Sequence, residues 1–227
     1  MIDPLLLTEW IKVLLALTFI TGALVVTRRD LFSLVSTYAA QSFLLVLAAV
    51  FLYLLDGSSV LLYLAALTLI SKVILIPYVM RSIQREMRIK RDLEFHYFTP
   101  ARSLVATIIL ILLVYTAFSE IIRELALSNL FYLGAVFGVS LTLMGMMVAV
   151  SRKKLVTKII GYLVMENGVL LFSLFLAELP FIVEVLIMID LFILVLLALI
   201  LTIGIDSSIE EFHMRLHPFH GWSKEED

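Results

Sequence analysis

Three ionisable residues stand inside long apolar stretches, where charge is costly. They are Lys72 in LTLISKVILIPYVM, Glu166 in IIGYLVMENG and Asp190 in VEVLIMIDLFILVLLALI. In a helix that rises about 1.5 Å per residue, each lies about 14–18 Å from the end of its stretch, near the middle of a hydrocarbon core about 30 Å thick. Because an unpaired charge costs about 2.5–3.5 kcal/mol at that depth, these side chains must be paired, neutralised or hydrated.

Two kinds of chemistry fit a lysine and two carboxylates at one level. In the first, Lys72 forms a structural salt bridge with Asp190 or Glu166 and locks helices together. In the second, the three residues belong to a polar row along which protons or ions move. Glu166 and Asp190 then carry or relay protons, and Lys72 is their electrostatic partner or a relay. A switchable ion pair would serve both purposes.

Further polar side chains extend this row. Glu184, one turn into the last apolar stretch, is expected at an entrance to the row or at the membrane interface. Pro77 removes a backbone hydrogen bond beside Lys72, and a helix broken next to an ionisable residue is common in transport proteins. Five residues either link the row by hydrogen bonds or make ordinary interhelical contacts: Tyr38, Gln41, Ser42, Tyr162 and Asn167.

The elements that carry these residues follow from the composition. The 227 residues are 62% hydrophobic and 16% charged, whereas soluble domains are about 25% charged. At about 20 apolar residues per membrane-spanning helix, this is enough for about seven helices. The sequence therefore predicts an all-α, polytopic membrane protein with seven transmembrane helices, at 9–27, 31–54, 59–80, 102–119, 129–150, 154–177 and 180–204.

The basic residues predict the orientation of these helices. They gather at 28–29, in the loop 81–102, at 152–158 and in the tail, which all fall on one side of a seven-helix arrangement. Basic residues accumulate on the cytoplasmic side of membrane proteins. We therefore expect a multi-pass protein of the cell membrane with its N-terminus outside and its C-terminus in the cytoplasm.

Two regions of the chain, 27–47 and 151–172, resemble each other. Each opens with a basic cluster, carries a Tyr ten residues after its first Arg, and then has a polar pair. This repeat predicts two three-helix units joined by a connector helix. The division is an N-terminal unit at 1–81, a cytoplasmic loop and connector helix at 82–124, a C-terminal unit at 125–205, and a polar cytoplasmic tail at 206–227.

Several classes of function are excluded. The chain has no Cys, which rules out disulfides, iron–sulfur clusters and thiolate metal sites. A net charge of −2 without a long basic run argues against nucleic acid as a partner. There is no P-loop, GxGxxG or Ser-His-Asp arrangement. We expect no catalysis by this chain alone, and no cofactor or metal site in it.

The segments LVSTYAAQSFLLV, LTLISKVILIPYVM, IIGYLVMENG and VEVLIMIDLFILVLLALI resemble the hydrogenase-4 component E family. The members of that family are membrane subunits of group 4 nickel–iron hydrogenases, such as formate hydrogenlyase. The resemblance covers nearly the whole chain, and the K-V-I-L-I-P and G-Y-x-x-M-E-N-G strings are its most specific parts.

The C-terminal half is also similar to the small three-helix K subunit of respiratory complex I, in which basic residues precede G-x-E-x-x-x-N. Gly161 and Asn167 match this pattern, and Asp190 matches a second carboxylate in the next helix. Leu163 stands in place of the first carboxylate, and Glu166 follows one helical turn later on nearly the same face. The role of that carboxylate would then survive with altered geometry.

The resemblance implies a subunit that binds no redox centre and continues a mid-membrane polar path for H⁺ or Na⁺. Its partners would be antiporter-like membrane subunits and the subunit that anchors the hydrogenase. In the N-terminal unit, Lys72 replaces an acid, and Gln41 and Ser42 replace a carboxylate, so a duplicate path there is not expected. The alternatives are a purely structural spacer and an independent small-solute transporter.

Overall fold

The computed structural model describes residues 3–28, 30–86, 100–125, 129–152 and 155–175, and then 185, 188–190, 192–193, 195–197 and 199. The elements of this part of the chain are helices, as the sequence predicts. Their bounds are α1 (Pro4–Thr27), α2 (Leu31–Asp56), α3 (Ser59–Thr68), the π-helix η1 (Leu69–Leu75), α4 (Ile76–Glu86), α5 (Pro100–Leu125), α6 (Asn129–Ser151) and α7 (Leu155–Leu174).

The first turns of the fold have clear local causes. Asp3 caps α1 by accepting a hydrogen bond from the Leu5 amide at 3.1 Å, and Asp30 caps α2 through the Ser33 amide at 3.0 Å. Both carboxylates satisfy amides that a helix N-terminus leaves free. Gly57 ends α2 with a φ of 72°, a left-handed conformation that glycine adopts without strain. These short connections make α1, α2 and α3 run antiparallel in turn.

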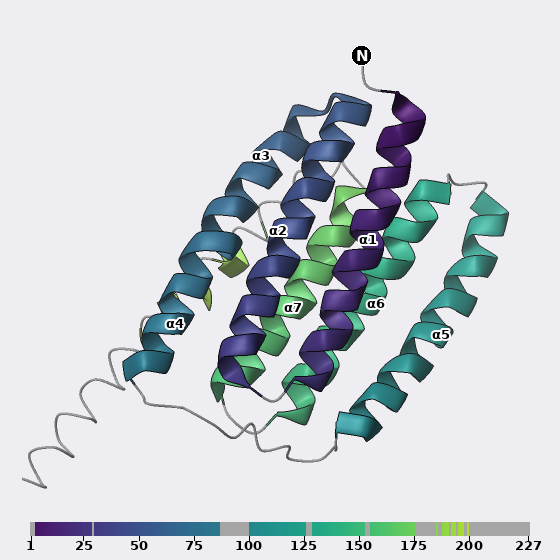
Figure 1. Ribbon diagram of the computed structural model, residues 1–227. Coiled ribbons are helices and arrows are strands. Elements are labelled where there is room, and N and C mark those ends of the chain that lie inside the picture. Colours follow the sequence, from purple (N-terminus) through teal and green to yellow (C-terminus); the bar gives the residue numbers. More distant parts are fainter. Residues whose placement is uncertain are drawn as a thin grey trace, which may run out of the picture.

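The helices form a bundle in which α2 is central (Figure 1). Helix α2 packs against α1, α7 and the rod formed by α3, η1 and α4. Helix α6 packs against α1, α5 and α7. The α3–α4 rod lies at one edge of the bundle in Figure 1, and α5 lies at the opposite edge. The interior between α2, α7 and η1 is therefore enclosed by helices from both halves of the chain.

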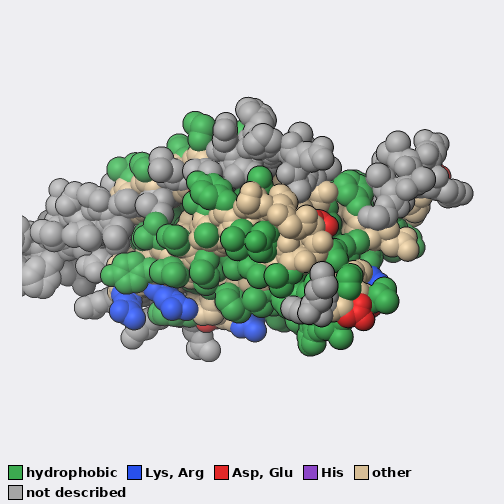
Figure 2. Space-filling model, turned by 90° about the horizontal axis from the view of Figure 1, so that it is seen from above, with side chains coloured by type: hydrophobic (Ala, Val, Ile, Leu, Met, Phe, Trp, Pro, Cys, Tyr) green, Lys and Arg blue, Asp and Glu red, His purple; other side chains and the backbone are tan. Residues whose placement is uncertain are grey.

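Five helices in the described part of the chain are long and apolar enough to cross a membrane. They are Pro4–Thr27, Leu31–Asp56, Ser59–Arg85, Asn129–Ser151 and Val156–Leu174, and they coincide with five of the predicted spans. The predicted span 102–119 falls within α5, and 180–204 lies largely outside the described residues. Hydrophobic side chains form most of the described surface in Figure 2. The chain is a multi-pass helical membrane protein.

The third span contains a feature that the sequence only partly indicates. Between α3 and α4, residues Leu69–Leu75 form a π-helix, and the Ile76 amide donates to the Ser71 carbonyl five residues earlier. Pro77, which has no amide hydrogen to donate, follows at once. The departure from regular helix expected near Lys72 is thus present, and π-helical turns occur frequently at functional sites.

Helices α6 and α7 approach each other unusually closely. A Cβ on Gly138 would lie 2.8 Å from the backbone nitrogen of Phe172, and a Cβ on Gly145 or Gly168 would collide with the backbone of α7 or α6. The sequence pattern G-x-x-x-G at Gly134 and Gly138 is typical of such close packing in membranes. This packing sets the position of α7, the helix that carries Glu166.

Candidate functional site

A buried charged triad lies between η1, α7 and the segment around Asp190. The Lys72 Nζ atom lies 3.0 Å from Glu166 Oε1 and 3.3 Å from Asp190 Oδ1. The side chains of Lys72 and Glu166 are each 2% exposed, and that of Asp190 is 10% exposed. Lys72 is near the middle of the 27-residue span Ser59–Arg85. The structure thus brings these three side chains into contact.

The π-helix supplies two groups to this triad. The Ser71 hydroxyl donates a hydrogen bond to Asp190 Oδ2 at 3.1 Å, while the next residue, Lys72, contacts Oδ1 of the same carboxylate. Both oxygens of Asp190 are therefore held by consecutive residues of η1. Ser71 is a site residue that sequence analysis missed, although its place beside Lys72 was a usable signal.

A second polar group lies between α2 and α7. The Asn167 Nδ2 atom donates to Gln41 Oε1 at 3.1 Å and to Ser42 Oγ at 3.0 Å. These three residues are fully buried. Gln41 Nε2 in turn donates a long hydrogen bond of 3.5 Å to the Thr18 carbonyl of α1. Since Asn167 follows Glu166 in the chain, the triad and this amide group form one polar layer across the bundle.

The other predicted residues divide into three cases. Tyr38, one turn before Ser42 on α2, is 1% exposed, and its electrostatic surroundings include Glu166 and Asp190. Tyr162 is 39% exposed, so its side chain does not share this buried environment. Glu184 lies outside the described residues.

Some polar atoms of this layer have no hydrogen-bond partner within the described part of the protein. They include Glu166 Oε2 and Asn167 Oδ1. Buried polar atoms are nearly always hydrogen-bonded, to protein or to water. These atoms could therefore bind a proton or a water molecule. With all groups ionised, the two carboxylates outnumber the one ammonium, so the triad carries one excess negative charge.

A third contact joins the two halves of the bundle at the end where α1 finishes. The Arg152 Nη2 atom donates to the Arg28 carbonyl at 2.7 Å and to the Val26 carbonyl at 3.3 Å. Arg28 and Arg152 are the first arginines of the two similar regions in the sequence. Gln41 and Ser42 likewise meet Asn167 of the other region. These contacts thus join the two regions of the sequence that resemble each other.

The fold and the triad define a class: a multi-pass helical membrane protein with a buried, charged polar layer. Among the described residues no group of three or more His, Cys, Asp or Glu side chains could hold a metal ion. Comparison with known proteins found no matching family model, no matching curated protein and no matching solved structure. The chemistry of the site must therefore be argued from its own residues.

Proposed function

We propose that the chain is a seven-span membrane-arm subunit of a complex I-related nickel–iron hydrogenase complex, in which it contributes a mid-membrane path for H⁺ or Na⁺. The proposed orientation places the N-terminus outside and the C-terminus in the cytoplasm. The resemblance to the hydrogenase-4 component E family supports the identity of the complex. The observation that supports ion movement is the contact of Lys72 with both Glu166 and Asp190.

The proposed mechanism uses the excess charge of the triad. One proton added to either carboxyl group makes the three groups neutral together, and a neutral cluster is the state that a buried site favours. Lys72 then pairs with the carboxylate that remains ionised. Because its ammonium sits on a flexible four-carbon stem, Lys72 can exchange one partner for the other. Each exchange is coupled to the transfer of the proton between Glu166 and Asp190.

The neighbouring groups have different roles in this proposal. The hydroxyls of Ser71 and Tyr38 can both donate and accept hydrogen bonds, so they suit proton transfer to and from the carboxylates. The amides of Gln41 and Asn167 form a fixed contact between α2 and α7. They position Glu166, and they continue the polar layer toward α1. Partner subunits would continue it further, to the antiporter-like subunits on one side and the hydrogenase-anchoring subunit on the other.

The test is the ion uptake that accompanies H₂ production in membrane vesicles containing the complex. We expect Glu166→Gln and Asp190→Asn to reduce the number of ions taken up per H₂ while the complex stays assembled. Glu120→Gln is the matched control, because Glu120 is an exposed carboxylate on α5. Unchanged uptake in both triad variants would leave only an architectural role.

The second candidate is a structural spacer that joins antiporter-like subunits to the hydrogenase module. It is favoured by the same ion pairs, because they connect η1, α7 and the segment around Asp190. In this case the triad variants lose assembly of the complex, measured by native gel electrophoresis, and the assembled fraction keeps full coupling. Partial uncoupling of an intact complex would exclude the spacer.

A further inference from the structure

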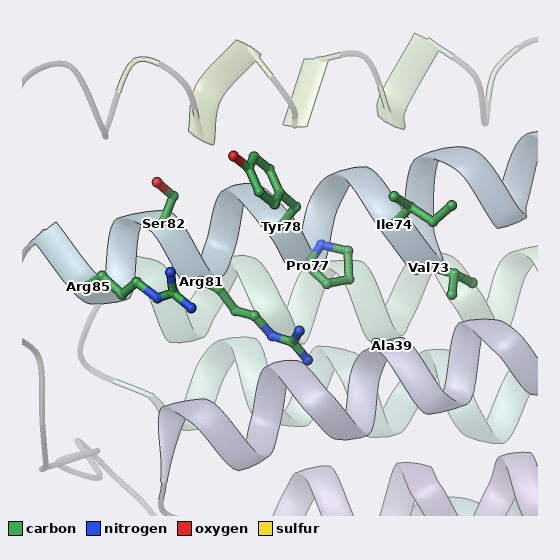
Figure 3. Close-up of a pocket in the computed structure, with 8 residues that line it drawn as sticks. All are labelled: Ala39, Val73, Ile74, Pro77, Tyr78, Arg81, Ser82 and Arg85. Carbon is green, nitrogen blue, oxygen red and sulfur yellow. The ribbon is translucent and has the colours of Figure 1, made fainter.

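A pocket of about 400 Å³ opens between α2 and the rod formed by η1 and α4 (Figure 3). The same rod carries Lys72, but no residue of the triad lines the pocket. Ala39 lines the pocket from α2. The rod lines it with an apolar part, Val73, Ile74 and Pro77, and with a basic part, Arg81 and Arg85.

The two parts of the pocket differ sharply in chemistry. Val73, Ile74 and Pro77 give one end an apolar wall, and Arg81 and Arg85 give the other end two guanidinium groups. In Figure 3 these arginines extend from one side of α4, while Tyr78 and Ser82 extend from the other side. Both arginines are exposed, and among the described side chains no acid forms an ion pair with either. A ligand that fits must be anionic at one end and apolar along the rest.

The length of the pocket matches one leaflet of a bilayer. Arg85 follows Val73 by twelve residues, a rise of about 18 Å along a helix, and half of a hydrocarbon core is about 15 Å thick. The basic end falls at the end of the candidate span Ser59–Arg85, where a helix that crosses a membrane reaches the lipid headgroups. The apolar end reaches toward the middle of the membrane.

We propose that this pocket binds an anionic phospholipid, with its phosphate between Arg81 and Arg85 and an acyl chain along the apolar wall. Guanidinium groups bind phosphate through paired, charge-assisted hydrogen bonds, and basic pockets between membrane helices bind anionic headgroups. Tyr78 and Ser82 also line the pocket. This proposal requires only that the chain spans a membrane, and it does not depend on ion movement through the triad.

The experiment measures how strongly the full chain prefers phosphatidylglycerol to phosphatidylcholine. The protein is placed in phosphatidylcholine nanodiscs with a trace of either lipid carrying a spin label on its acyl chain. The fraction of label immobilised at the protein gives the relative association of the two lipids. The test variant is Arg81→Gln/Arg85→Gln. The matched control is Arg28→Gln/Lys158→Gln, which removes the same charge from exposed positions at the same end of the bundle, outside the pocket.

At about 1 kcal/mol for each basic residue near the headgroups, loss of both arginines should lower the preference for phosphatidylglycerol by up to about 30-fold. The control variant should keep most of the preference. Ala39→Leu, which fills the apolar part without a change of charge, should also lower binding of phosphatidylglycerol. Added inorganic phosphate should displace little of the bound phosphatidylglycerol, since the acyl chain contributes to binding.

The proposal is overturned if the unmodified chain shows no preference for phosphatidylglycerol. It is also overturned if the test and control variants lose the preference equally, because the effect would then come from general surface charge. A full preference in both Arg81→Gln/Arg85→Gln and Ala39→Leu would likewise exclude this pocket. Ion uptake by vesicles containing the complex is measured separately, so failure here leaves the proposed function standing.

Discussion

Replacement of Lys72 by Met should destabilise the bundle more than replacement of either acid that it contacts. The reason is the charge count of the triad. Without Lys72, Glu166 and Asp190 remain as two buried carboxylates with no cation between them. When only one of the two acids is replaced, one ammonium and one carboxylate remain, and the triad becomes a neutral pair. The order of the variants therefore tests the charge balance directly.

The magnitudes follow from burial and distance. Lys72 is 1% exposed and lies 3.0 Å from Glu166, and loss of one partner from a buried ion pair costs about 3–5 kcal/mol. Glu166→Gln should cost less, about 1.5–3 kcal/mol, the usual value for one lost hydrogen bond to a charged group. Glu166→Gln/Asp190→Asn leaves the ammonium unpaired, so it should again cost about 3–5 kcal/mol.

The assay is reversible unfolding of the full chain in mixed micelles with increasing dodecyl sulfate, followed by the fluorescence of its two tryptophans. Each variant is compared with the unmodified protein by its free energy of unfolding. The control is Lys12→Met, because Lys12 pairs with Glu9 at 2.7 Å, and the side chains are 39% and 70% exposed, far more than those of the triad. An exposed pair at this distance contributes less than about 1 kcal/mol.

Two results would refute the reasoning. The first is a cost for Lys72→Met as small as that for Lys12→Met, which would mean that the triad is hydrated and screened. The second is a triple variant, Lys72→Met/Glu166→Gln/Asp190→Asn, that is no more stable than Lys72→Met alone. Neutral replacement of a whole buried ionic group is often tolerated, so we expect the triple variant to regain most of the lost stability.

The remaining predictions use the same unfolding measurement. Gly145→Ala should cost about 1–3 kcal/mol, because its Cβ would collide with the backbone of α7. Gly22→Ala should cost less, because its Cβ meets flexible side-chain atoms at 2.6 and 2.8 Å. Equal costs for the two variants would contradict this reasoning. Arg152→Gln should cost about 2–4 kcal/mol through the loss of charged hydrogen bonds to two carbonyls at the end of α1, and a cost below about 0.5 kcal/mol would argue that these bonds are not maintained. Asn167→Leu should cost about 1–3 kcal/mol, because it leaves buried partners unpaired. The double variant Asn167→Leu/Gln41→Leu should cost less than the sum of the two single changes, and strict additivity would count against the contact.

The helices and the triad could be predicted from sequence because both depend on one large energy, the cost of polar groups in lipid. That cost sets the length of the apolar helices, which is why five predicted spans coincide with observed ones. It also requires Lys72 to find an acid. The sequence left open which of the two acids pairs with Lys72, and the structure shows contacts with both.

Features that depend on packing between distant helices could not be predicted. Tyr38 and Tyr162 occupy matching places in the repeat, yet one is buried and the other is 39% exposed, because α2 is central in the bundle and this face of α7 is not covered. The sequence places Arg152 in a basic cluster, but its contacts with the Val26 and Arg28 carbonyls at the end of α1, where it is 1% exposed, were not predicted. The π-helix has only Pro77 as a local signal.

The contact between η1 and the segment around Asp190 has a consequence for how the protein is made. Ser71 and Asp190 are 119 residues apart in the chain, and ribosomes add about 5–20 residues per second. The third helix therefore waits about 6–24 s after its synthesis before Asp190 exists. During this interval Lys72 lacks its contact with Asp190. We expect the nascent third helix to stay beside the translocon or a membrane chaperone until the C-terminal helices are inserted.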